Sequence, residues 1–347
     1  MKKKKTFELP LDKFIDFSLY NKKNGYYMKK KSFGKDGDFI TAPNISRLFS
    51  EMIAIWVISF WQSMGSPRKF NLIELGAGNG EMMKTLIESF ERFPNFFRSC
   101  NFFIFEKSPT LVETQKNRLH KNKIRWISEI HKIKKKPCLF IANEFFDSLA
   151  IKQFKKKQNI WYERYVNFED KDNAFFFEKK IDIKKIENKI DFKISKNQNF
   201  IEFSQLGFNY LKKISNIIKK HKGGLLIIDY GYNDKKMRNT LQAISDHKFS
   251  KVLKNIFNSD ITHNINFHLL KKIVLLNGLH ENLTTQKNFL INMGIKQRAY
   301  ILSKKLSFSK KADIYYRLER LINEKQMGTL FKVMLIKNKK NKFSLGF

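Results

Sequence analysis

The chain has 347 residues and a formal net charge of +36, from 68 basic and 32 acidic side chains. This length allows one large domain with insertions, or two domains that share a core. The two cysteines form no Cys-x-x-Cys pair, which argues against a disulfide framework and indicates no metal site. Residues 2–5 are basic but precede no apolar segment, and no apolar stretch is long enough to span a membrane. We therefore expect a soluble, cytoplasmic protein without a signal or transit peptide.

The positive charge would ordinarily indicate a nucleic acid or an anionic membrane as partner. Lys, Asn, Ile and Phe are, however, abundant together along the whole chain, as drift in an AT-rich coding sequence produces. We assign the larger share of the charge to this drift and do not expect nucleic acid as a partner.

An N-terminal helical region, residues 1–66, is expected before the main sheet. Apolar residues at helical spacing predict one helix within 8–30 and a second over 44–61. Between them, Asp38 and Thr41 lie in a glycine-containing loop that we expect to fold over a bound cofactor as a lid. The alternative is a loop fixed by a local aspartate turn.

The next segment predicts a strand, a glycine turn and a helix. Residues 70–75 have the apolar character of a buried parallel strand, and 82–90 have the pattern of a helix. The turn carries an acid and three glycines at alternate positions: Glu74, Gly76, Gly78 and Gly80. Glycine fits here because a tight turn needs positive φ and because a missing Cβ lets a ligand approach the backbone.

This pattern differs from the dinucleotide fingerprint G-x-G-x-x-G. It resembles the first motif of class I S-adenosylmethionine (SAM) methyltransferases, E-x-G-x-G-x-G. The resemblance implies that SAM is the cofactor and that Glu74 lies near its cationic methionine end. The alternative is an ordinary glycine turn in an α/β protein.

A second strand, 101–106, also ends in an acid, Glu106. An acid at this position of a nucleotide-binding α/β unit can accept hydrogen bonds from both ribose hydroxyls. We therefore predict that Glu106 holds the adenosine ribose, with a helix-capping or surface acid as the alternative.

Residues 138–142 predict a further buried strand, which ends in a polar and aromatic run: Asn143, Glu144, Phe145, Phe146 and Asp147. A later strand over 225–229 ends in Asp229 and Tyr230. Ligands of open α/β sheets bind beyond the carboxyl ends of the strands, so these side chains are expected at one site.

The remaining segments predict elements around this core. They are an edge β-hairpin or small sheet within 151–200, a helix over 205–220, a loop-rich stretch over 240–266, helices up to 323, an antiparallel strand over 330–336 and a solvated basic tail over 337–342. Residues 67–347 are thus expected to form the main domain, with insertions at about 151–200 and 240–323.

Six motifs occur in the order seen in the MidA-like methyltransferases, which include the mitochondrial complex I assembly arginine methyltransferases and their bacterial relatives. They lie at residues 25–28, 37–43, 73–80, 142–149, 227–232 and 326–333. The resemblance implies a class I, Rossmann-like α/β fold with a mostly parallel sheet and an antiparallel closing strand. It further implies a bacterial enzyme that methylates arginine in a partner protein, with a respiratory complex I subunit as one expected substrate. The oligomeric state is open, and a homodimer is one expectation.

Where family members often read D-[IL]-T-x-x-V-D-F, this chain has Asn266 in place of the second acid. A role that needs charge at this position is therefore in doubt. His263 has no partner at metal-ligand spacing, so we interpret it as a loop histidine.

The segment after residue 142 carries the predicted chemistry. A carboxylate pair can hold a guanidinium bidentately and help to accept its proton, so Glu144 and Asp147, with Asn143, are the predicted catalytic residues. The alternative is that Asn143 caps a helix whose first turn carries the two acids. Phe145 and Phe146 wall the methyl pocket or pack in the core, and Asp229 and Tyr230 are expected to line the substrate channel.

Two other functions remain as alternatives. A nucleic-acid amino-methyltransferase usually has [DNS]-P-P-[YF] after this strand, and residues 143–146 lack both prolines. A non-catalytic assembly factor that retains the fold is disfavoured by the intact glycines and Glu106.

Overall fold

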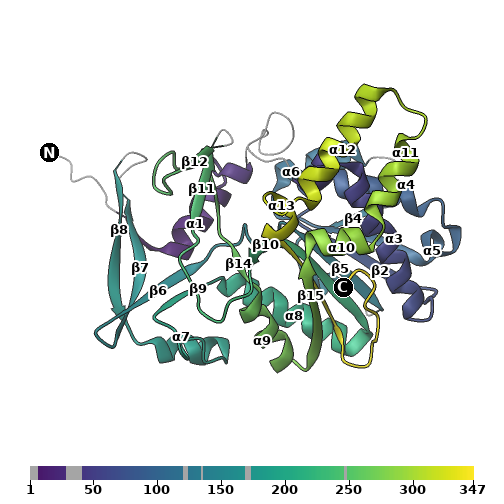
Figure 1. Ribbon diagram of the computed structural model, residues 1–347. Coiled ribbons are helices and arrows are strands. Elements are labelled where there is room, and N and C mark those ends of the chain that lie inside the picture. Colours follow the sequence, from purple (N-terminus) through teal and green to yellow (C-terminus); the bar gives the residue numbers. More distant parts are fainter. Residues whose placement is uncertain (1–6, 29–40, 120–123, 134–135, 169–172, 246–247) are drawn as a thin grey trace.

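The computed structural model describes residues 7–28, 41–119, 124–133, 136–168, 173–245 and 248–347. A mixed sheet forms its centre (Figure 1). The strand order is β15 (Leu279–Thr285), β16 (Phe331–Asn338), β10 (Gly223–Tyr232), β5 (Cys138–Asn143), β2 (Phe70–Leu75), β3 (Cys100–Phe105) and β4 (Ile124–Ile127). The short strand β14 (Ile265–Asn266) extends β10.

The predicted mixture of strand directions is confirmed. Strands β10, β5, β2, β3 and β4 are parallel to one another. Strand β16 is antiparallel to both β10 and β15. This is the class I, Rossmann-like arrangement. Because the five parallel strands share one direction, the residues that follow β2, β3 and β5 meet at one edge of the sheet.

Helices cover both faces of the sheet because its strands alternate their apolar side chains between two cores. Leu72 packs into one core and the adjacent Ile73 into the other. The first core contains residues of α3 (Arg47–Ser63), α4 (Glu81–Phe90), α5 (Pro94–Ser99), α10 (Gln286–Asn292), α11 (Ile295–Ser303) and α12 (Phe308–Ile322). The second contains residues of α8 (Gln205–His221) and α9 (Phe267–Leu276).

The insertion at 151–200, expected as a β-hairpin or a small sheet, belongs to a second sheet that also takes in strands from outside the insertion. Its strands are β1 (Phe7–Pro10), β7 (Ile160–Phe168), β6 (Lys152–Lys157) and β9 (Phe200–Phe203), with β8 (Ala174–Ile181) also paired to β7. Helix α7 (Ile183–Ile190) follows β8, and α1 (Leu11–Tyr20) packs beside β7. Lys152 joins these parts through Asp12 at 2.9 Å and Glu163 at 2.7 Å.

Two predictions about the C-terminal third were wrong in part. The stretch up to residue 323 contains β15 as well as helices. In the expected solvated tail, Lys339, Lys340 and Lys342 are exposed, but Lys337 is not. Lys337 is only 2 % exposed, and its ammonium donates to the Phe343 carbonyl. The indole N–H of Trp56 also donates to the Leu345 carbonyl at 2.9 Å. The chain end is therefore packed against α3.

The expected helix over 44–61 is interrupted at Ser46, which separates α2 (Ala42–Ile45) from α3. Ser46 is in an extended conformation, and its hydroxyl caps α3 by accepting from the Leu48 N–H at 3.3 Å. The remaining elements are short: η1 (Tyr26–Met28), α6 (Pro109–Arg118), η2 (Ile130–Lys132), α13 (Met327–Leu330) and a small sheet of β12 (Lys248–Ser250), β11 (Gln242–Ser245) and β13 (Asp260–Thr262).

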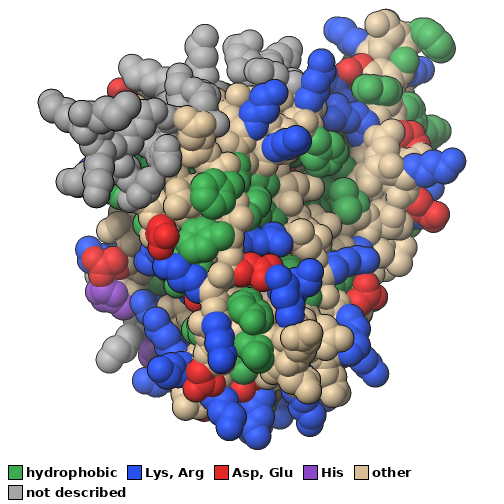
Figure 2. Space-filling view, turned by 90° about the vertical axis from the view of Figure 1, so that its left-hand side faces the viewer, with side chains coloured by type: hydrophobic (Ala, Val, Ile, Leu, Met, Phe, Trp, Pro, Cys, Tyr) green, Lys and Arg blue, Asp and Glu red, His purple; other side chains and the backbone are tan. Residues whose placement is uncertain are grey.

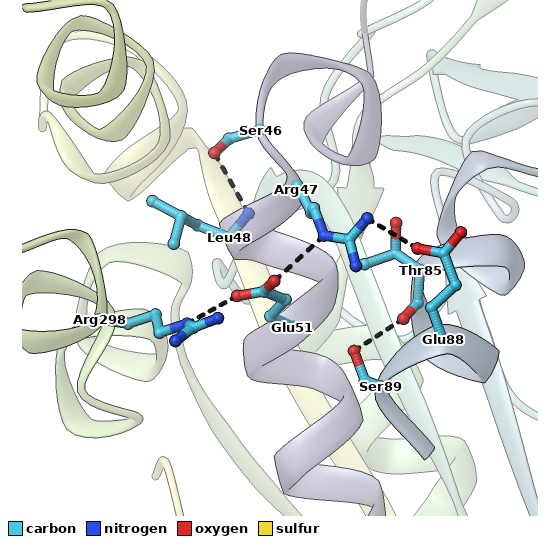
Figure 3. A network of polar contacts seen from close by, with 8 residues as sticks. All are labelled: Ser46, Arg47, Leu48, Glu51, Thr85, Glu88, Ser89 and Arg298. Carbon is cyan, nitrogen blue, oxygen red and sulfur yellow. Dashed lines mark hydrogen bonds and ion pairs between the residues drawn. The ribbon is translucent and has the colours of Figure 1, made fainter. Parts of the chain in front are cut away.

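A network of charged side chains fixes α3 to two neighbouring helices (Figure 3). Arg47 contacts Glu51 at 3.1 Å and Glu88 of α4 at 2.7 Å, and Arg298 of α11 contacts Glu51 at 2.8 Å. Elsewhere basic side chains are scattered over the surface, as Figure 2 shows for one face. This scatter fits the interpretation of the net charge as mainly compositional.

Candidate active site

A cavity lies beyond the carboxyl ends of β2, β3 and β5. Glu74, Glu106 and Glu144, each at or just after the end of one of these strands, line it together with residues from distant segments. The distant residues include Tyr20, Tyr27, Thr41 and Asn44 from the N-terminal region, Tyr210 of α8 and Asp260 of β13. The structure thus brings the predicted strand-end acids together.

The glycine turn after β2 has the backbone geometry that its composition predicts. Gly76, Gly78 and Gly80 have φ angles of 65°, 52° and 81°, in the left-handed region that favours glycine. A Cβ at Gly76 would stand 2.8 Å from the Phe145 ring. Gly76 and Gly78 line the cavity, whereas Gly80 is the N-cap of α4 and faces Leu119 and Gln115.

Glu106 is held by the chain itself. Its Oε1 accepts the backbone N–H groups of Lys107 at 2.8 Å and Ser108 at 2.9 Å, and its Oε2 accepts the Gln115 amide at 3.2 Å. Burial raises the pKa of Glu106, while these hydrogen bonds act to lower it. A carboxylate offers about four lone-pair positions, so roughly one remains for a ligand. A ribose contact by Glu106 stays a prediction, and this count favours one hydroxyl over two.

Glu74 carries a buried oxygen that has no hydrogen-bond partner among the described residues, Oε2. Burial, followed by the charge of Glu106, raises the pKa of Glu74 to about 8. An ionised carboxylate without a partner is costly in such a place, and a cation at the cavity wall would relieve that cost. The site thus fits the positive methionine end of SAM.

Glu144 follows β5 with φ of 49°, a left-handed conformation that is uncommon for a residue with a side chain. Its Oε1 accepts the Ala42 N–H at 3.3 Å and the Asn143 amide at 3.2 Å. Burial, followed by the charge of Asp147, raises the pKa of Glu144 to about 8. Residues 144–150 form turns, so the alternative in which Asn143 caps a helix here is wrong.

Asp147 faces the same end of the cavity. Its Oδ1 is buried without a hydrogen-bond partner among the described residues, as is Oδ1 of Asn143. Burial raises the pKa of Asp147 to about 6, although the nearby Tyr230 hydroxyl favours its ionised form. Glu144 and Asp147 therefore form an acid pair with unused acceptor positions.

Asp229 supports this turn from behind and does not line the cavity. It is completely buried, and its carboxylate accepts the N–H groups of Phe146 at 3.1 Å, Asp147 at 3.3 Å and Tyr230 at 3.0 Å. Phe146 and Tyr230 also lie outside the cavity lining, whereas Phe145 is part of it. Of the four residues expected to line a substrate channel, only Phe145 lines this cavity, and the channel role stays a prediction.

The predicted lid residues cannot both be placed. Thr41 lines the cavity and is the N-cap of α2, where its hydroxyl accepts the Asn44 amide at 2.8 Å. Asp38 lies outside the described residues.

Sequence reasoning missed two linking residues. The Gln115 amide donates to the Gly78 carbonyl at 2.9 Å as well as to Glu106, so it ties the glycine turn to the second strand. Asp260 accepts from the Tyr27 hydroxyl with both oxygens at 2.9 Å and lines the cavity beside the acid pair. For Gln115, the available signal was that Glu106, one of the two acceptors of its amide group, lies at the end of a strand. For Asp260, the signal was its place as the aspartate of the D-I-T motif.

Two residues of the same motif have local roles. Asn266 is the N-cap of α9 and accepts the Leu269 N–H at 2.9 Å, a role that asparagine and aspartate fill equally well. His263 lies between β13 and β14, as the interpretation of a loop histidine requires. It is buried, and this burial lowers its pKa to about 4.

Comparison with known proteins agrees with this architecture. Residues 52–283 match the family described as "Putative S-adenosyl-L-methionine-dependent methyltransferase". The chain is 28% identical to protein arginine methyltransferase NDUFAF7, mitochondrial, of Xenopus tropicalis, over 95% of this chain and 82% of the relative. Its identity to the Homo sapiens protein of the same name is 27%, over 94% and 80%.

The fold also matches a solved structure. A Burkholderia thailandensis protein, crystallised with S-adenosyl-homocysteine, superposes with a TM-score of 0.79 at 19% identity, covering 98% of this chain and 90% of that one. The family match covers most of the chain, so the chain belongs to this family of SAM-dependent methyltransferases. SAM is its cofactor, and the unpartnered Glu74 oxygen and the open glycine turn fit that ligand.

Within the described ranges, no helix is long and apolar enough to cross a membrane. In the same part of the chain, no three His, Cys, Asp or Glu side chains are arranged to hold a metal ion.

Proposed function

We propose that this enzyme methylates arginine in a partner protein. The names of the Xenopus and human relatives state that activity, and the match to them extends along nearly the whole chain. The acid pair after β5 supports the proposal independently of the names.

The observation that carries the proposal is that the cavity lining is acidic although the chain as a whole is basic. The chain has 68 basic and 32 acidic side chains, yet the described residues that line the cavity include seven acids and one lysine, Lys107. The acids are Asp16, Glu74, Glu81, Glu106, Glu144, Asp147 and Asp260. A cavity with this lining attracts cations and repels phosphate groups.

The acid pair can act on a guanidinium in two ways. Bound SAM supplies a methyl group on a positively charged sulfur. Glu144 and Asp147 can hold the guanidinium through charge-assisted hydrogen bonds and draw its positive charge away from the attacking nitrogen. When the new N–C bond forms, one guanidinium proton must leave. Ionised Glu144, whose pKa in the empty cavity is about 8, is the proposed acceptor.

The alternatives fit this cavity less well. A nucleic-acid substrate would bring phosphates to an opening lined by acids, which costs free energy. A non-catalytic role leaves unexplained the buried, unpartnered oxygens of Glu74 and Asp147.

Three finer expectations from the sequence stay predictions. They are a respiratory complex I subunit as substrate, a homodimeric state and a cytoplasmic location. The names of the Xenopus and human relatives include the word mitochondrial.

The proposal is tested by incubating the purified enzyme with labelled SAM and a lysate from cells that lack it. We expect label in protein, on arginine nitrogens mapped by mass spectrometry. Parallel samples of total RNA and DNA should stay unlabelled. Label on lysine, on another side chain or on nucleic acid would overturn the proposal.

A further inference from the structure

Helices α11 and α12 form a hairpin that projects from the side of the molecule opposite the second sheet (Figure 1). Its base is firmly attached: Arg298 contacts Glu51 of α3 at 2.8 Å, and the Arg317 guanidinium donates to the Ile45 carbonyl at 3.0 Å. Its outer part, residues 300–316, makes up what we call the hairpin tip.

The hairpin tip exposes an unusual amount of apolar surface. Phe308 is 88% exposed, Tyr316 65% and Ile301 59%. On α12, Phe308, Tyr315 and Tyr316 are spaced at i, i+7 and i+8, so they share one face of the helix. Exposed apolar residues that occur singly are normal, but a group of them on one projecting element indicates a contact surface.

The hairpin tip is predominantly basic. Residues 300–316 contain four lysines, Lys304, Lys305, Lys310 and Lys311, and one acid, Asp313. None of the four makes an ion pair with any residue that the structure describes. By contrast, Asp313 is paired with Arg317, and Arg298 at the base is paired with Glu51. Among the described ion pairs, the four lysines are therefore the unpaired charges of the hairpin tip.

The exposed apolar side chains and the unpaired lysines together distinguish between three possible partners of the hairpin tip: a second copy of the chain, another protein and a lipid bilayer. A second copy of the chain would bring its own unpaired lysines against these. A protein partner is a weaker fit, because lysine is depleted in protein interfaces. An anionic lipid bilayer satisfies both features: aromatic rings settle at the level of the headgroups, and lysine stems extend so that the ammonium groups reach lipid phosphates.

We propose that the hairpin tip docks the enzyme on the surface of an anionic lipid bilayer. The contact is peripheral and uses two signals, a few inserted apolar side chains and a local basic cluster. The hairpin tip contains none of the residues that line the cavity, so docking uses no side chain of the active site.

The test is co-sedimentation of the full chain with vesicles of phosphatidylcholine alone or with about one third phosphatidylglycerol. We expect binding to the anionic vesicles, weakened by salt, and little binding to the neutral ones. Phe308→Ser should lower the partition coefficient several-fold. The matched control is Phe249→Ser, at a phenylalanine of β12 that is 80% exposed elsewhere on the surface.

Charge is tested by a second pair of variants. Lys304→Glu with Lys305→Glu should weaken binding about tenfold or more. Lys212→Glu with Lys213→Glu, on exposed positions of α8, changes the net charge equally and should have a much smaller effect. Thermal unfolding of each variant checks that it is folded.

Several outcomes would overturn the proposal. They are unchanged vesicle binding by folded Phe308→Ser, equal losses in the two lysine variants, or equal binding to neutral and anionic vesicles. A concentration-dependent dimer that Phe308→Ser abolishes without any vesicle binding would assign the hairpin tip to a second copy instead.

Discussion

The carboxylates at the two ends of the cavity differ in how many hydrogen bonds they accept from the rest of the chain. At the end formed by β2 and β3, Glu106 accepts three hydrogen bonds from the chain, and Gln115 ties it to the glycine turn. At the end formed by β5, Glu144 and Asp147 both line the cavity, and Asp147 Oδ1 has no hydrogen-bond partner among the described residues. Glu106 is held by the chain itself, whereas the buried oxygens of Glu74 and Asp147 have no described partner and would be satisfied by a cation. We call the end with Glu106 the nucleotide end and the end with Glu144 and Asp147 the transfer end.

The largest expected effect is at the nucleotide end. Gly78→Val places a branched side chain at φ of 52°, against the cavity, and should abolish SAM binding, measured by calorimetry. Gly65→Val is the control, because Gly65 has φ of 84° with open space around its Cβ. Similar losses of affinity in both folded variants would show that backbone strain, and not contact with the cofactor, is responsible.

A substitution at the transfer end should lower turnover. Glu144→Gln keeps the shape of the side chain but removes its charge and its capacity to accept a proton. We expect kcat to fall by about 100-fold or more while SAM affinity changes little. A variant with full activity on protein would contradict the division between the two ends, as would one that loses SAM.

Glu106→Gln tests the nucleotide end, where we expect an effect on SAM affinity but not on turnover. Loss of one hydrogen bond to a charged group should weaken SAM by roughly 1 to 3 kcal/mol. With saturating SAM, kcat should stay near that of the wild type. A change in SAM affinity below a few tenths of a kcal/mol would show that Glu106 has only a structural role and does not contact the cofactor.

A further effect is expected on stability as a function of pH. Burial and Asp147 raise the pKa of Glu144 from 4.5 to about 8, so between these values the folded empty enzyme binds a proton that the unfolded chain has released. Stability contributed by this group is full below pH 4.5 and is lost as the pH rises toward 8. Chemical unfolding of Glu144→Gln should therefore show a shallower decline over this range. An unchanged slope would mean that Glu144 is ionised in the empty cavity.

The sequence was most informative where structure is local. Apolar runs such as 70–75 predicted the parallel strands, and the three glycines predicted their own positive φ angles. The edge strand β15 was missed because its residues alternate weakly between buried and exposed positions. Lys337 was misjudged because a lysine can bury its stem while its ammonium finds a carbonyl.

The candidate site was predictable only in part for a similar reason. The acids that end strands lie next to recognisable patterns, so Glu74, Glu106 and Glu144 could be selected. The contact between Tyr27 and Asp260 joins residues 233 positions apart, and no local pattern reports it. The surroundings of Asp229 were not predictable, because a strand-end acid that faces the cavity and one that accepts the backbone N–H groups of the next turn look alike in the sequence.

The claim that the transfer end selects a cation can be measured without knowing the protein substrate. Ethylguanidinium and ethylurea have nearly the same shape and differ in charge. With S-adenosyl-homocysteine present, NMR titration should show ethylguanidinium binding about tenfold or more tightly than ethylurea, and Glu144→Gln should reduce this preference several-fold. Equal affinities for the two compounds in the wild-type enzyme, or a preference that is unchanged in Glu144→Gln, would contradict the account.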